Sequence, residues 1–157
     1  MKLKGILAIA AVAAVGFGAS QAHAAGKMVS EPGLTPYTIV DGGIPKSLTG
    51  QAGDAANGRK VVIHRKKGNC LACHQMPIPE EQFHGETGPD LAGVGDRLTE
   101  AELRLRLVNP KTVNEDTMMP SFYRTAGYTQ INKNFADKSI LTAQEVEDVI
   151  AYLKTLK

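Results

Sequence analysis

The chain has 157 residues and carries 18 Lys and Arg against 16 Asp and Glu, so it offers no strongly basic surface for nucleic acid. Its length predicts a single small domain. With no tryptophan and only 5% aromatic residues, that domain has few aromatic side chains from which to build a core.

Residues 1–24 predict a secretory signal peptide. Lys2 and Lys4 form the positively charged start, residues 6–17 form a short apolar run, and Ala22-His23-Ala24 is a small-x-small cleavage site. The apolar run is too short to span a bilayer, and a retained membrane anchor is the alternative. Cleavage would remove both lysines and leave 16 basic against 16 acidic side chains. We expect a periplasmic protein that has no membrane anchor after cleavage near Ala24.

Residues 25–53 predict an irregular N-terminal extension, because prolines and glycines interrupt the segment and it shows no helical period. Its apolar residues, including Tyr37, Ile44 and Leu48, indicate that the extension lies against the domain or against a partner. No strand pair is predicted in this segment or elsewhere in the chain.

The first helix is predicted to begin after Asp54, a favourable N-cap residue, and to run through Val61-Val62-Ile63 towards Asn69. A basic run, residues 64–67, follows it. We expect this run to be a solvated helix end that complements the helix dipole, and a docking role is the alternative.

Both cysteines lie in the string Cys70-Leu71-Ala72-Cys73-His74, which is the attachment signature of a c-type haem. Each thiol would add across one vinyl group of the porphyrin to form a thioether, and His74 would bind the iron from the proximal side. One covalently bound haem c is therefore predicted, with electron handling as the function. The alternative from another class is a dithiol oxidoreductase using Cys70 and Cys73, which is typical of a βαβ context.

Two further helices are predicted from capping boxes. Thr99 with Glu102 begins one helix, which ends at Asn109-Pro110 because the residue before proline avoids the α region. Thr142 with Glu145 begins the other, which is expected to run to the chain end. Its apolar stripe recurs at helical spacing: Val146, Val149, Ile150, Leu153 and Leu156. The predicted fold class is all-α, with three main helices and long loops around one covalent haem, over residues 54–157.

A six-coordinate haem needs a second axial ligand, and the side chains that could supply one are His64, His84, Met28, Met76, Met118 and Met119. Met76 is too close to His74 to reach the opposite face, and His84 has the sequence setting of a surface histidine. Met119 is favoured because it lies in a loop between the last two helices and Pro120 keeps it extended. Met118 is the second choice, and the alternative is that both methionines pack in the core.

In its order of landmarks the chain resembles the monohaem class I cytochromes c over about residues 54–157. The strings that carry this resemblance are the haem motif at 70–74, Gly88-Pro89-Asp90-Leu91, Gly93-Val94-Gly95-Asp96-Arg97, Met119-Pro120 and the segment 148–153. The resemblance implies a class I cytochrome c fold in which the Pro89 carbonyl meets the proximal histidine. It further implies that Arg97 meets a haem propionate and that the first and last helices cross at Gly58 and Tyr152.

A narrower resemblance, to the SoxX family, is carried by the stretch 118–124, which reads MMPSFYR, and by residues 135–149. It implies the electron-transfer subunit of a SoxAX-type L-cysteine S-thiosulfotransferase, in a non-covalent heterodimer with the cytochrome SoxA. That complex joins thiosulfate to a cysteine of the carrier SoxYZ and passes electrons to a soluble acceptor. Because the chain has no third cysteine, no catalytic residue is predicted here, and the bond-making site is expected on SoxA. The alternative is a free-standing periplasmic cytochrome c shuttle.

Apolar and amphipathic residues surround the expected iron ligand: Met118, Pro120, Phe122 and Tyr123. This composition predicts the core of an interface with SoxA. The alternative is that Phe122 and Tyr123 seal the haem from water.

Overall fold

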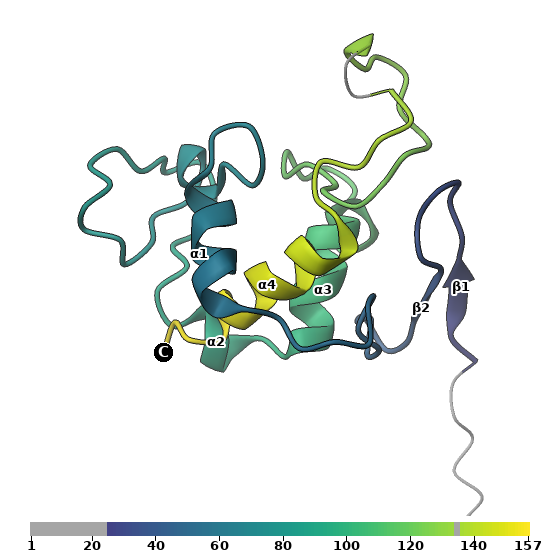
Figure 1. The fold of residues 1–157 in the computed structure, drawn as a ribbon, viewed down its shortest axis with the longest axis horizontal. Coiled ribbons are helices and arrows are strands. Elements are labelled where there is room, and N and C mark those ends of the chain that lie inside the picture. Colours follow the sequence, from purple (N-terminus) through teal and green to yellow (C-terminus); the bar gives the residue numbers. More distant parts are fainter. Residues whose placement is uncertain (1–24, 134–135) are drawn as a thin grey trace, which may run out of the picture.

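The computed structural model describes residues 25–133 and 136–157, so the predicted signal peptide lies outside the described residues. In chain order the elements are β1 (Lys27–Val29), β2 (Tyr37–Ile39), α1 (Ala55–Ile63), the 3₁₀ turn η1 (Cys70–Ala72), α2 (Val94–Arg97), α3 (Glu100–Val108), the 3₁₀ turn η2 (Pro110–Thr112) and α4 (Ala143–Leu153). Figure 1 shows α4 crossing between α1 and α3, with long loops around them. The predicted all-α class I cytochrome c fold is confirmed. None of the described helices has the length and apolar character that a membrane crossing requires.

Helix α1 begins where the N-cap predicts and ends earlier than expected. The Asp54 carboxylate accepts hydrogen bonds from the backbone N–H groups of Ala56 and Asn57, at 2.8 and 3.3 Å. The prediction that the helix continues towards Asn69 is wrong, because His64 is extended and Asn69 has a left-handed φ of 47°. The chain instead folds back, with the backbone N–H groups of His64 and Gly68 both donating to the Val61 carbonyl.

The basic run 64–67 therefore forms an exposed turn in front of the haem motif. At the end of this run, Lys67 forms an ion pair with Glu145 near the start of α4.

Helices α1 and α4 approach most closely at Gly58. A Cβ atom at this position would overlap the Asp148 carbonyl oxygen and lie 2.9 Å from the Val149 nitrogen. The predicted crossing at Gly58 is confirmed. The part of α4 nearest to Gly58 is the backbone of Asp148, and not Tyr152 as the resemblance implied. Tyr152 lies one turn further along α4 and is buried. Only glycine allows the two backbones this separation.

Both predicted capping boxes are present. Thr99 and Glu102 begin α3, and Thr142 and Glu145 begin α4, each pair with its reciprocal hydrogen bonds. The stripe predicted for the last helix is buried throughout, at 8% exposure or less. The prediction that this helix reaches the chain end is wrong. It ends at Leu153, after which the Leu156 carbonyl accepts from the N–H of Gly95 in α2, at 2.8 Å.

The N-terminal extension contains a strand pair, so the prediction that the chain has none is wrong. Strands β1 and β2 are antiparallel, with Lys27 opposite Ile39 and Val29 opposite Tyr37. Figure 1 shows this hairpin on the far side of α3 from α1. Its strands are only three residues long, too short for an alternating pattern to be recognised in the sequence.

The rest of the extension lies against the domain, which is one of the two positions expected from its apolar residues; the other was against a partner. Ile44 and Leu48 are buried in the core. Between them and the helices lies a buried ion pair, in which the Arg104 guanidinium of α3 donates two hydrogen bonds of 2.8 Å to the Glu147 carboxylate of α4. Arg104 also donates to the Ile44 carbonyl, and the Leu48 N–H donates to Glu147. The pair therefore joins the extension to both helices.

Candidate haem site

The haem motif forms a single tight turn at η1. The backbone N–H groups of Cys73 and His74 both donate to the Cys70 carbonyl, at 3.1 and 2.9 Å, which brings the three residues of the motif into one turn. No disulfide joins Cys70 and Cys73. Burial, with a smaller contribution from Cys73, raises the pKa of the Cys70 thiol to about 12. A reactive dithiol needs a lowered pKa, so this environment disfavours the dithiol oxidoreductase alternative.

The proximal histidine is oriented by the chain itself. His74 Nδ1 lies 2.7 Å from the Pro89 carbonyl oxygen, as the class I resemblance implies. A carbonyl can only accept, so the proton resides on Nδ1 and the lone pair of Nε2 is free to bind iron. Gly88 makes this approach possible, because a Cβ atom there would overlap the imidazole ring of His74.

Arg97 is the last residue of α2, the short helix that follows the loop carrying Pro89. Its guanidinium is exposed and donates to the backbone carbonyls of Asp90, at 2.9 Å, and of Ala92. The Leu91 N–H donates in turn to the Gln75 carbonyl, 3.0 Å away. Arg97 therefore braces the Pro89 loop, and its contact with a haem propionate stays a prediction.

The two adjacent methionines differ in burial. Met119 is partly buried and packs against the core, whereas Met118 is 82% exposed. A thioether that points to solvent cannot be held over a buried haem face, so this difference favours Met119. The Met119 N–H donates to the Thr117 hydroxyl at 3.2 Å, which fixes the backbone on one side of the residue.

Phe122 and Tyr123 do not form a surface, so their predicted place in an interface is wrong. They are 5% and 3% exposed. The Phe122 N–H donates to the Leu107 carbonyl of α3, and the Tyr123 hydroxyl accepts from the Thr35 N–H, each at 2.9 Å. Their apolar character therefore serves the core of this chain, and of the predicted interface residues Met118 and Pro120 remain exposed.

The other candidate axial ligands lie elsewhere. Met28 is exposed on β1, His64 is exposed beyond α1, and Met76 is buried in the core. His84 is half-buried, so the prediction of a surface histidine is wrong. Its Nδ1 accepts from the Met76 N–H at 3.3 Å, and its buried Nε2 has no hydrogen-bond partner among the described residues.

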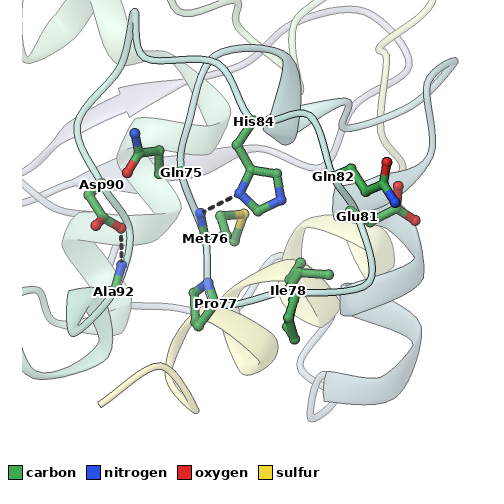
Figure 2. Close-up of a pocket in the computed structure, with 10 residues that line it drawn as sticks. Gln75, Met76, Pro77, Ile78, Glu81, Gln82, His84, Asp90 and Ala92 are labelled. Atoms are coloured by element: carbon green, nitrogen blue, oxygen red, sulfur yellow. Dashed lines mark hydrogen bonds between the residues drawn. The ribbon is translucent and has the colours of Figure 1, made fainter.

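Figure 2 shows His84 directed across its own loop towards Met76, beside a hollow of about 380 Å³. The segment that follows His74 lines this hollow, and none of the predicted haem residues does. No sequence signal distinguishes the inward orientation of this histidine, because it depends on how the loop closes.

The residues present fit a c-type haem. Two thiols lie on one turn, the adjacent imidazole has its iron-binding nitrogen free, and a glycine leaves room for that ring. A partly buried methionine follows in a later loop, and none of the strand context typical of a dithiol enzyme surrounds the cysteines in the described chain. Among the described residues no cluster of three or more His, Cys, Asp or Glu offers a separate metal site.

Comparison with known proteins agrees with this chemistry. The cytochrome c family matches residues 55–157. A chain in the crystal structure of SoxXA from P. pantotrophus is 40% identical, with a TM-score of 0.72, over 77% of this chain and 94% of that one. The c-type cytochrome SorU from Sinorhizobium meliloti is 24% identical, over 65% of this chain and 88% of that one, with a TM-score of 0.41. Ferric cytochrome c-550 from Paracoccus versutus is 21% identical, over 66% of this chain and 98% of that one, with a TM-score of 0.37.

No match was found among curated proteins. The family match spans more than half of the chain, and the 40% identical neighbour spans more than two thirds of it. The chain therefore belongs to the cytochrome c family, as a SoxX-like electron-transfer cytochrome that carries covalently bound haem c.

Proposed function

We propose that this chain is the electron-transfer subunit of a periplasmic SoxAX-type complex that oxidatively joins thiosulfate to a cysteine of a SoxYZ carrier. The observation that carries the proposal is the 40% identity to a chain of SoxXA over nearly the whole of that chain. We assign Cys70 and Cys73 to thioether attachment and His74 and Met119 to the iron. Arg97 is assigned to a propionate.

The haem, when bound, supplies a one-electron redox centre. The chain's own residues set its surroundings. The Pro89 carbonyl holds the proton on His74 Nδ1 and raises the basicity of the other ring nitrogen. With His74 and the neutral thioether of Met119 as its ligands, a bound haem would have a comparatively high reduction potential, which suits an electron acceptor. Phe122 and Tyr123, which follow Met119 closely in the chain, are buried in the core against which Met119 packs.

The reaction also limits what this subunit does. Joining the sulfane sulfur of thiosulfate to a carrier thiol forms one S–S bond, breaks one S–H bond and releases one proton and two electrons. The two cysteines of this chain are both committed to haem attachment, so no thiol is left to take part in the bond. The bond-making site therefore belongs to the SoxA partner. A haem held by this chain would supply one-electron chemistry, so the two electrons would leave for a soluble acceptor one at a time.

The test is co-purification with a SoxA-type cytochrome. Expressed together in a host that attaches haem, the two chains are expected to elute as one heterodimer. A reducing agent should not separate them, because this chain has no cysteine available for an intersubunit disulfide. Elution of this chain as a monomer beside its SoxA would contradict the proposal and favour the free-standing shuttle.

Two exposed methionines provide a matched pair of variants. Met118 adjoins the proposed iron ligand and is 82% exposed, whereas Met28 lies on β1 and is 72% exposed. Met118→Glu is expected to weaken the heterodimer because it places a charge in the contact, and Met28→Glu is expected to leave it intact. Both variants should keep the haem spectrum. Equal elution profiles for the two would contradict a contact at Met118.

A further inference from the structure

The turn of the N-terminal hairpin is hydrogen-bonded to the loop that contains Met119. We define the hairpin turn as residues 30–36 and the Met119 loop as residues 117–128. Glu31, in the hairpin turn, accepts hydrogen bonds from three N–H groups of the Met119 loop: from Arg124 Nε at 2.9 Å, from the Thr125 N–H at 2.7 Å and from the Ala126 N–H at 3.0 Å. The two segments are more than 80 residues apart in the sequence.

Glu31 is well shielded from water, since its side chain is 9% exposed and that of Arg124 21%. Burial alone would raise the pKa of Glu31, but the hydrogen bonds from Thr125, Arg124 and Ala126 outweigh it and hold the pKa below its usual value. The carboxylate is therefore ionised at neutral pH. Hydrogen bonds to an ionised acceptor are about twice as strong as those between neutral groups. Glu31 therefore holds the hairpin turn and the Met119 loop together more strongly than a neutral side chain would.

Two further bonds join the same segments. The Thr125 hydroxyl donates to the Pro32 carbonyl at 3.1 Å, and the Thr35 N–H donates to the Tyr123 hydroxyl at 2.9 Å. The hairpin turn thus contacts the Met119 loop at every residue from Tyr123 to Ala126.

The remaining anchors of the Met119 loop do not reach this stretch. The Phe122 N–H donates to the Leu107 carbonyl, and its own carbonyl accepts from the Leu141 N–H, each at 2.9 Å. Upstream, the exposed Lys111 ammonium donates to the Thr117 carbonyl at 2.9 Å. Within the described residues, the hydrogen bonds that join residues 123–126 to other elements run to the hairpin turn, and the Tyr123 ring is also buried in the core.

We propose that Glu31 is a positioning residue for Met119: through the hairpin turn it fixes the Met119 loop and so sets how firmly the thioether sulfur remains on the haem iron. The inference rests on the proposed ligation by Met119. It assigns a role to the N-terminal extension, which lies outside the segment matched by the cytochrome c family.

The variant that tests this is Glu31→Gln. A glutamine amide offers one acceptor oxygen and places an NH₂ group against the N–H groups of the loop, so it cannot replace the carboxylate. The matched control is Asp148→Asn. Asp148 also accepts three hydrogen bonds, from the Asp54 N–H, Asn57 Nδ2 and Gln144 Nε2 at 2.7–2.9 Å, but at the junction of α1 and α4.

Two readouts are needed on the ferric holoprotein. Hydrogen exchange of the Thr125 and Ala126 amides should become about tenfold faster in Glu31→Gln, equivalent to about 1.4 kcal/mol, and should be unchanged in Asp148→Asn. For each variant, the temperature at which the methionine-to-iron charge-transfer band is lost is compared with that variant's own global melting temperature. The band should be lost further below the melting temperature in Glu31→Gln than in Asp148→Asn.

Several outcomes separate the possibilities. If the amides exchange faster while the charge-transfer band is lost at the same temperature as in the wild type, Glu31 does not position Met119 and the inference is overturned. A wild-type protein without the band would refute the ligation by Met119, and the positioning role with it. Should Glu31→Gln not yield holoprotein, Tyr123→Phe removes only the bond from Thr35. Tyr123→Phe should also lower the temperature at which the charge-transfer band is lost, by a smaller amount. An unchanged temperature would overturn the inference.

Discussion

The buried ion pair between Arg104 and Glu147 holds the extension against α3 and α4. The two side chains are 3% and 5% exposed, and Glu147 accepts from Arg104 twice and from the Leu48 N–H once. Glu147→Gln would remove the negative charge and leave the buried Arg104 guanidinium with only the exposed, solvent-screened carboxylate of Glu100, 3.8 Å away, as a counter-ion. Breaking a buried pair in this way costs about 3–5 kcal/mol, against a total stability of roughly 5–15 kcal/mol for a typical domain.

The assay is denaturant unfolding of the holoprotein, followed by far-ultraviolet circular dichroism. The midpoint should fall while the denaturant dependence stays constant, because the surface exposed on unfolding is unchanged. On heating, the melting temperature should drop by about 10 °C. The haem absorption bands should not change, because neither residue belongs to the candidate haem site.

Glu100→Gln is the matched control. Its carboxylate lies 3.8 Å from the same guanidinium but is 65% exposed, so solvent screens the interaction. Its loss should cost less than about 0.5 kcal/mol. If Glu147→Gln were no more destabilising than Glu100→Gln, the reasoning that the buried pair joins the extension to α3 and α4 would be refuted.

Three further predictions concern the haem and the junction of α1 and α4. Met119→Ala should remove the methionine-to-iron charge-transfer band and lower the reduction potential, whereas Met118→Ala should keep both, and the opposite result would reverse the ligand assignment. A Cys70→Ala, Cys73→Ala double variant should be largely unfolded by circular dichroism, because a small domain without its cofactor would contain a large cavity; a cooperative melt would contradict this. Burial would raise the pKa of Asp148, but its hydrogen bonds outweigh this and lower it. Asp148→Asn should therefore lose stability that the wild type has above about pH 4, and the difference should close as the pH falls through the lowered pKa, as measured by denaturation at neutral pH and at about pH 3.

Local chemistry made much of the fold predictable. The capping boxes at Thr99 and Thr142 locate the starts of α3 and α4, since an N-cap depends only on residues three apart. The haem motif is likewise a short string with a specific chemistry. Within the site, the contact between His74 and Pro89 followed from the class I resemblance, and the structure shows it.

The features that were missed depend on distant contacts. The β1–β2 hairpin is too short to show a period, and the ends of α1 and α4 are set by a turn at Gly68 and by Gly95 in α2. Arg104 and Glu147 are 43 residues apart, and each alone resembles a surface charge. Apolar composition did not tell whether Phe122 and Tyr123 face a partner or the core, because both settings use the same residue types.

We propose that the haem of this chain takes up electrons released when SoxA joins thiosulfate to SoxYZ. Stopped-flow absorption of the oxidised holoprotein tests this most directly. The haem bands should change to those of the reduced form only when the SoxA partner, the SoxYZ carrier and thiosulfate are all present, with no reduction when the carrier cysteine is replaced by alanine. Reduction at the same rate without the SoxA partner would contradict the claim.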